Sequence, residues 1–76
     1  SNTLIIRNAD EPGRIKEVAT ALSDAQINIA TMQVFRDKRG GYAVMVVETD
    51  QIVPKEAMEA LESKKGIIRV KFLLAN

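Results

Sequence analysis

Amide and carboxylate side chains gather around one short loop near the N-terminus of the chain. Asn8 is followed by Asp10-Glu11-Pro12-Gly13, and a helical pattern begins directly afterwards. A helix N-terminus presents unpaired backbone N–H groups and the positive end of the helix dipole, and both favour a carboxylate. Gly13 would let a ligand approach the backbone closely, Asn8 carries a donor and an acceptor, and Asp10 could accept a hydrogen bond from an ammonium group. These groups together predict a site for an α-amino acid.

The candidate site residues also have structural interpretations. An Asp just before a helix commonly accepts hydrogen bonds from first-turn amides, so Asp10 could be the N-cap of that helix. Gly13 could simply ease the chain into the helix. Asn28, which opens the next extended segment, could be a turn residue. The sequence leaves both interpretations open for each residue.

The composition of the chain excludes most other kinds of catalytic and binding site. The chain of 76 residues contains no Cys and no His, which excludes disulfides, thiol catalysis, imidazole metal sites and His acid–base catalysis. Lys and Arg total 11 against 10 Asp and Glu, so no concentrated basic footprint for nucleic acid is expected. The longest apolar run, residues 43–47, is far shorter than a membrane-spanning helix, and no signal-peptide pattern is present. We expect no catalytic residue, no cofactor, no metal, no nucleic acid and no membrane for this domain, and a cytoplasmic location.

Six elements must position the candidate site. The apolar pattern switches between period two, typical of strands, and a spacing of three and four residues, typical of helices. Pro12 and Pro54 suit the first turns of the two helices, and Lys64-Lys65-Gly66 suits the end of the second. Strands are expected at residues 3–8, 27–36, 42–49 and 67–74, and helices at residues 12–25 or 14–25 and from residue 54 to about 64.

The order βαββαβ predicts an α+β fold of the ferredoxin-like kind. Such a fold has a four-stranded antiparallel sheet with both helices on one face. The nearly continuous apolar character of residues 42–49 predicts a strand in the interior of the sheet. Residues 37–41 are expected to form a hairpin loop with Lys38 and Arg39 at a solvated tip.

The pattern also assigns side chains to faces. Core-facing positions are expected at Ile15, Val18, Ala19 and Leu22 in the first helix, at Ala30, Met32 and Val34 in the second strand, and at Ile68, Val70, Phe72 and Leu74 in the last strand, with Met45 and Met58 also interpreted as packing. The opposite sheet face is expected to mix apolar with basic residues: Ile5, Ile29, Phe35, Ile67 and Leu73 beside Arg7, Arg69 and Lys71. A face this apolar, on a domain this small, predicts self-association.

Other functions of the same architecture fit the residues less well. An RNA-binding sheet needs exposed aromatic side chains, and only Phe35, Tyr42 and Phe72 are available. A copper carrier of this topology needs paired cysteines. A phosphate cradle of the acylphosphatase kind could use Asn8, Arg14 and Asn28, but the neighbouring Asp10 and Glu11 would repel the phosphate.

Two segments make the chain resemble a known family. Asp10-Glu11-Pro12-Gly13 in the first loop, with INIA at residues 27–30 opening the second strand, resembles the ACT domain, a regulatory amino-acid-binding module. The resemblance covers essentially all 76 residues. INIATMQV at residues 27–34 and GGYAVMVVE at residues 40–48 look like the C-terminal ACT domain of the β chain of bacterial iron–sulfur-dependent L-serine dehydratase. A similar domain ends bacterial phosphoglycerate dehydrogenase, where serine binds between two paired ACT domains as a feedback inhibitor.

The resemblance implies a function and a set of ligand residues. It implies a domain spanning residues 3–76 that binds a small amino acid, L-serine, and forms a homodimer. The ligand would be held by Asn8, Asp10 and Gly13, with Asn28 supplied across the dimer. The serine-responsive relatives commonly have His at the position of Asn8 and Asn at the position of Asp10, so the chain departs from their pattern at two positions.

The resemblance also implies a parent enzyme. The domain would regulate the catalytic region of a longer chain, most naturally an L-serine dehydratase that converts serine to pyruvate and ammonia. Any iron–sulfur cluster would then lie elsewhere, because this chain has no Cys. Ser1-Asn2 would be a tag scar or a linker. The alternatives are the regulatory domain of phosphoglycerate dehydrogenase, a dimerisation module with a vestigial site, or a freestanding small enzyme.

Overall fold

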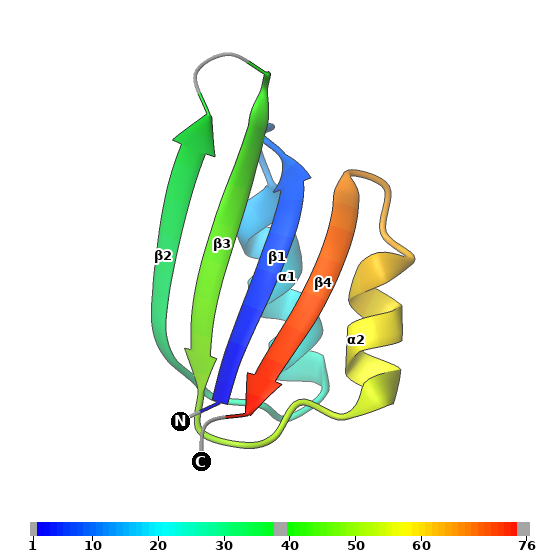
Figure 1. The fold of residues 1–76 in the computed structure, drawn as a ribbon. Coiled ribbons are helices and arrows are strands. Elements are labelled where there is room, and N and C mark those ends of the chain that lie inside the picture. The colour runs from blue at the N-terminus through cyan, green and yellow to red at the C-terminus, as the bar shows by residue number, and fades with distance from the viewer. Residues whose placement is uncertain (1, 38–39, 75–76) are drawn as a thin grey trace.

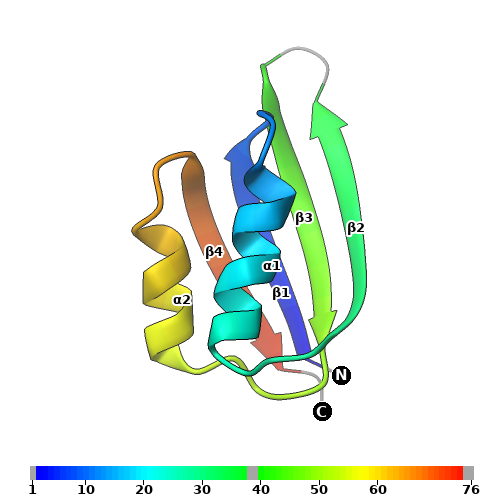
Figure 2. The same cartoon turned by 180° about the vertical axis from the view of Figure 1, so that it is seen from behind.

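The computed structural model describes residues 2–37 and 40–74. It contains six elements in the order βαββαβ: β1 (Asn2–Ala9), α1 (Arg14–Asp24), β2 (Ile29–Asp37), β3 (Tyr42–Thr49), α2 (Lys55–Glu62) and β4 (Ile67–Leu74). The sheet has the strand order β2-β3-β1-β4, and every neighbouring pair is antiparallel. Both helices cover the same face of the sheet (Figures 1 and 2). The predicted ferredoxin-like architecture is therefore confirmed, with β3 inside the sheet, whereas the predicted hairpin tip at Lys38 and Arg39 lies outside the described residues.

The hydrophobic core lies between the sheet and the two helices. Val18 and Leu22 of α1 and Leu61 of α2 are completely buried, because the apolar positions recur at helical spacing on one side of each helix. The sheet contributes alternate residues of β1 and β3: Leu4, Ile6, Met45 and Val47. Met32 and Met58 pack against this cluster, as predicted.

Two irregularities in the sheet overturn several predicted side-chain directions. In β2 the register shifts between Ile29 and Thr31, so Ile29 packs on the core and Ala30 is exposed. In the β1–β4 pair the register shifts next to Asn8, so Ile67 is buried and Ile68 is 50% exposed. An extra residue in one strand reverses the alternation beyond it, which a strict period-two pattern cannot anticipate.

Two further predicted core positions lie at the surface. Leu74 ends the edge strand β4 and is 58% exposed. Ile15 is in the first turn of α1 and is 43% exposed.

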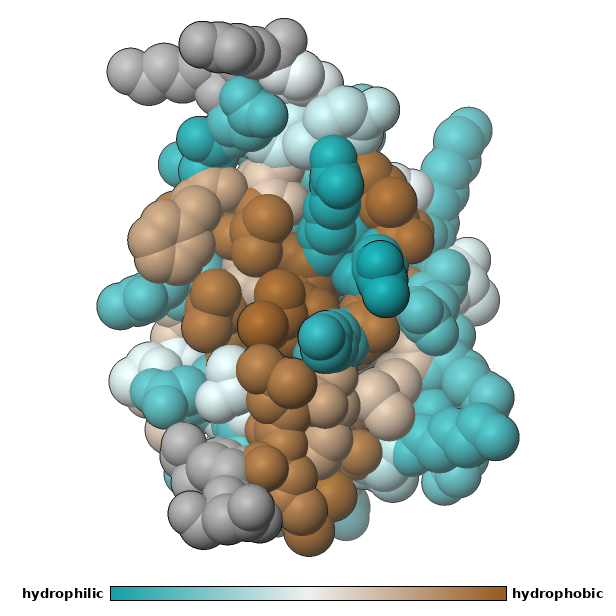
Figure 3. Space-filling model, in the orientation of Figure 1, coloured by the Kyte–Doolittle hydropathy of each residue, from teal (hydrophilic) through white to brown (hydrophobic). Residues whose placement is uncertain are grey.

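The second face of the sheet carries no helix and faces the viewer in Figure 1. Cross-strand pairing places Ile5 beside Val46 and Lys71, and Arg7 beside Val44 and Arg69. Apolar and basic side chains are mixed on this face (Figure 3), as predicted, although Ile29 and Ile67 belong to the core instead. Within residues 2–37 and 40–74, no helix is long and apolar enough to span a membrane.

Candidate functional site

A hollow of about 300 Å³ lies beside the loop that joins β1 to α1. This volume is at the lower end of the range of about 300–1,000 Å³ found for small-molecule pockets. The loop supplies one wall, the first turn of α1 a second, and the helix-side face of the sheet the floor. The lining residues are Asn8, Asp10, Glu11, Pro12, Gly13, Arg14, Ile15, Val34, Arg36, Ala43 and Met45. Three of the four predicted site residues therefore lie together.

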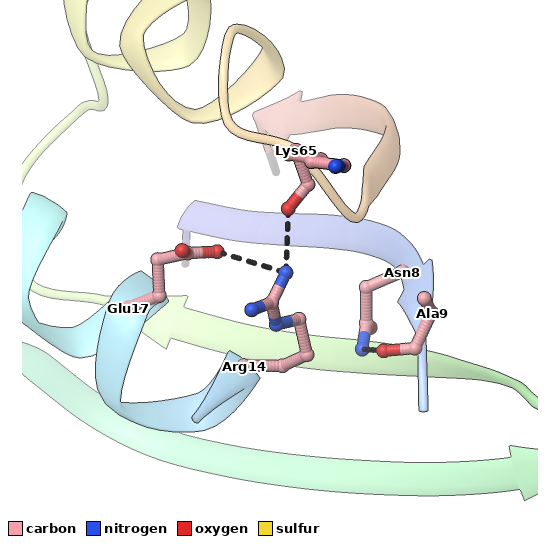
Figure 4. A network of polar contacts seen from close by, with 5 residues as sticks. All are labelled: Asn8, Ala9, Arg14, Glu17 and Lys65. Atoms are coloured by element: carbon pink, nitrogen blue, oxygen red, sulfur yellow. Dashed lines mark hydrogen bonds and ion pairs between the residues drawn. The ribbon is translucent and has the colours of Figure 1, made fainter. Parts of the chain in front are cut away.

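Asn8 is the buried polar residue of this hollow. It is only 1% exposed, because β1 is an interior strand and Asn8 points to the helix-covered side. Its Nδ2 donates a hydrogen bond to the carbonyl oxygen of Ala9 at 2.9 Å (Figure 4). Its Oδ1 has no hydrogen-bond partner among the described residues. A buried acceptor left unpaired costs about 1–3 kcal/mol, so a donor from a ligand in the hollow would recover that cost.

Gly13 begins α1 in a conformation that suits glycine. Its φ of 89° lies in the left-handed region, and a Cβ built there would meet nothing within 4 Å. The first intrahelical hydrogen bond runs from the Glu17 N–H to the Gly13 carbonyl. The amides of Ile15 and Lys16 lie in the first turn, where no intrahelical carbonyl is available to them. The helix end that borders the hollow therefore offers donors and positive potential to an anionic group.

Asp10 does not cap α1. The N-cap is Gly13, and no side chain of the described residues caps the helix. The Asp10 carboxylate instead accepts a hydrogen bond from Arg36 Nε of β2 at 3.2 Å. The Asp10 N–H donates to the Gly41 carbonyl at 2.7 Å, which ties the loop to the end of the β2–β3 hairpin. The loop is anchored by the sheet, and the carboxylate stays at the rim of the hollow.

Arg14 is a residue of the hollow that the amino-acid interpretation of the sequence missed. Its guanidinium donates to the Lys65 carbonyl through Nη1 and lies 3.6 Å from Glu17 Oε1 (Figure 4). Its buried Nε has no hydrogen-bond partner among the described residues. The side chain fits because Gly66 has no Cβ, which would otherwise collide with Nη1. The sequence does show a basic residue in the first turn of a helix. It does not show that this residue contacts a loop more than fifty residues further along the chain.

Asn28 lies at the other end of the sheet. Its N–H donates to Gln51 Oε1 at 2.8 Å, and its carbonyl accepts from the Asp50 N–H at 3.0 Å. These contacts fix the segment before β2 to the turn after β3, near Thr49, whereas the hollow lies near Ala43 at the opposite end of β3. Within one protomer Asn28 does not meet Asn8, Asp10 and Gly13.

The hollow contains binding groups and no set of metal ligands. No group of three Asp or Glu residues suited to a metal ion occurs among residues 2–37 and 40–74. The side chains that line it are an amide, two carboxylates, two guanidinium groups and apolar residues. Such a set can hold both ends of a zwitterion, because it offers acceptors to an ammonium group and donors to a carboxylate.

The fold is shared with solved structures of low sequence identity. The ACT domain of GTP pyrophosphokinase from Chlorobium tepidum has a TM-score of 0.71 at 17% identity, and the match covers 95% of each chain. A formyltetrahydrofolate deformylase from Pseudomonas putida has a TM-score of 0.78 at 15% identity, over 97% of this chain and 28% of that one. These likenesses concern the fold alone.

Proteins related in sequence identify the family of the chain more specifically than the shared fold does. The D-3-phosphoglycerate dehydrogenase of Methanocaldococcus jannaschii is 45% identical over 63 residues, which are 83% of this chain and 12% of that protein. The probable L-serine dehydratase β chain of Bacillus subtilis is 34% identical over 67 residues, which are 88% of this chain and 30% of that protein. The chain thus spans only a small part of either relative. Residues 2–66 match the sequence profile of the ACT domain, and the chain belongs to the ACT domain family.

Proposed function

We propose that this domain binds a small amino acid, L-serine, in the hollow beside the β1–α1 loop and thereby regulates an attached enzyme. The observation that carries the proposal is the unpaired Oδ1 of Asn8, buried in the lining of that hollow. A core position in an interior strand normally holds an apolar residue, as Leu4 and Ile6 do in the same strand. A ligand ammonium group donating to Oδ1 would account for the polar residue at this position.

The two ends of the ligand find complementary groups. The carboxylate would lie against the N-terminus of α1, with the unpaired Nε of Arg14 as an additional donor. The ammonium group would lie between Asn8 Oδ1 and the carboxylate of Asp10. Gly13 would keep the backbone open to the ligand.

A second copy of the chain would complete the site. Asn28 lies at the far end of its own protomer, so it can contribute only to the hollow of a partner. The edge strand β2 pairs with β3 alone in this fold, and the open sheet face mixes apolar with basic side chains. Pairing through the β2 edge would extend the sheet and leave the open face uncovered. A ligand that binds one arrangement of the dimer more tightly would raise the population of that arrangement. This would change the activity of the attached catalytic region.

Two parent enzymes are candidates. We propose a cytoplasmic L-serine dehydratase, whose iron–sulfur cluster would lie in another part of the chain and leave this domain without a cofactor. Phosphoglycerate dehydrogenase is the alternative parent, which the 45% identity to the M. jannaschii protein supports. The third possibility is a dimerisation module with a vestigial site, in which the chain forms a dimer but the hollow binds no ligand.

Titration calorimetry of the chain against the twenty common amino acids tests the proposal. We expect heat with L-serine and a loss of binding of at least about tenfold in Asn8→Leu, because the ammonium group loses a charge-assisted hydrogen bond. Met58→Ala is the control, since it removes packing on α2 away from the hollow and should leave the affinity unchanged. Absence of heat with all twenty amino acids, measured on dimeric protein, would overturn the proposal and leave the dimerisation module.

A further inference from the structure

A second hollow of about 300 Å³ lies on the open face of the sheet. Its lining combines three cationic side chains, Arg7, Arg69 and Lys71, with two apolar ones, Ile5 and Val44. The cations come from the neighbouring strands β1 and β4. Figure 3 shows this face with hydrophilic side chains standing over a hydrophobic floor. The chain as a whole carries a net charge of only +1, so the concentration of positive charge is local.

The arrangement of these cations is unfavourable without a counter-charge. Arg7 and Arg69 are directly opposite each other across the β1–β4 pair, and Lys71 is two residues further along the same strand. Like charges directly opposite in a sheet destabilise it. Within residues 2–37 and 40–74, the ion pairs Arg14–Glu17 and Arg36–Asp10 include none of these three cations. The hollow has charge complementarity to an anion that supplies several negative charges.

One cation is held in place before any ligand arrives. The guanidinium carbon of Arg7 lies 5.4 Å from the centroid of the Tyr42 ring, a cation–π contact between β1 and β3. This contact limits the conformations of the Arg7 side chain, and less entropy is therefore lost when it binds a ligand. Within the part of the chain that the structure describes, neither Arg69 nor Lys71 makes such a contact, so both can adjust to the ligand.

The apolar floor of the hollow indicates which class of anion would bind there. Ile5 and Val44 present only hydrocarbon, and they are half-buried in the interior strands β1 and β3. An inorganic anion would satisfy the cations but leave this floor in water. A carbon skeleton that bears two or three carboxylates would cover the floor and pair with the cations at the rim. We propose that the open face of the sheet binds an organic di- or tricarboxylate.

This site is distinct from the amino-acid hollow. Arg7 and Asn8 are neighbours in β1, and successive side chains of a strand point to opposite faces. Asn8 thus belongs to the helix-covered side, and Arg7 to the open side. Variants of one site can be made without changing residues that line the other.

Citrate, inorganic phosphate and acetate serve as probes at constant ionic strength, with binding followed by calorimetry and by amide chemical shifts. We expect citrate to bind at least about tenfold more tightly than acetate, since it engages several cations. Shifts should appear at Ile5, Arg7 and Val44 and be absent from Asp10, Glu11 and Gly13. Phosphate that binds as tightly as citrate, or shifts confined to residues 10–13, would overturn the assignment.

A charge-matched pair of variants separates the site from general electrostatics. Arg69→Gln/Lys71→Gln should weaken citrate binding by about tenfold or more. Lys16→Gln/Lys55→Gln removes the same charge from exposed positions on the two helices and should leave the affinity unchanged. Circular dichroism and thermal unfolding check that both variants are folded. Citrate also stabilises folded proteins in general, and its effect on the helix variant measures that general contribution. Equal weakening in both variants would overturn the site.

Discussion

At the scale of single residues, Arg14 and Gly66 link the candidate amino-acid site to a loop remote in sequence. Arg14 begins α1, and its guanidinium reaches the Lys65 carbonyl in the α2–β4 loop (Figure 4). The same loop is held to β1 by a hydrogen bond from the Ala9 N–H to the Gly66 carbonyl at 2.8 Å. Gly66 has a φ of 99° and leaves room for the guanidinium. The wall of the hollow therefore depends on a glycine that does not line it.

Gly66→Ala should destabilise the domain by about 1–3 kcal/mol, because the backbone lies in a left-handed region and the new Cβ displaces Arg14. Urea denaturation measures the loss. Gly41→Ala is the matched control: its φ of 69° is also positive, but nothing lies within 4 Å of the added carbon. The contact with Arg14 predicts that Gly66→Ala and Arg14→Ala are non-additive, and additive losses would contradict it.

Asp10→Ala should change the free energy of unfolding by less than about 1 kcal/mol, because its partner Arg36 is largely exposed and such ion pairs contribute little. A helix N-cap would cost about 1 kcal/mol or more, and Asp10 does not have that role. Denaturation and serine titration are measured on the same variant. Weakened serine binding with stability retained is the expected outcome, whereas retained binding with lost stability would point to a structural role.

At the scale of elements, α2 depends on packing more than on its own helical propensity. It has eight residues, and an isolated helix of that length is unstable in water. Ala57 and Leu61 are its buried residues, and Leu61 is completely covered by the core. The helix is thus held in place by its contact with the sheet and with α1.

Leu61→Ala should cost about 2–5 kcal/mol, since it leaves a cavity where α2 meets the core. For a domain of this size that is a large part of the total stability. Thermal unfolding and helical circular dichroism report the loss together. Glu59→Ala, on the exposed side of the same helix, should unfold close to the parent chain, and an equal loss in both variants would contradict the packing argument.

At the scale of the whole molecule, the sheet separates two chemically different surfaces. One face buries the core and carries, at one end, the hollow proposed to bind an amino acid. The other face is open, mixed apolar and basic, and carries the proposed carboxylate site. A small domain buries only about 60% of its unfolded surface, so part of its apolar area stays exposed and is available to a second copy.

Dimer formation should appear as a dependence on protein concentration. We expect sedimentation at micromolar concentration to show a dimer and the unfolding temperature to rise with concentration, because association stabilises the folded state by mass action. L-serine should raise the unfolding temperature further if it binds between two copies. A monomer with a concentration-independent unfolding temperature would contradict the dimer.

The sequence by itself determined the order of elements, the fold class and the cluster of Asn8, Asp10 and Gly13. It could do so because these features depend on local periodicity, turn chemistry and short spacing along the chain. Only the tertiary structure decided the role of residues that contact segments distant in the sequence. It paired Asp10 with Arg36 instead of the helix, brought Arg14 to Lys65, and reversed the directions of Ile67 and Ile68 through a shift in strand register. Register and long-range contacts are set by packing of the whole sheet, and no window of sequence contains that information.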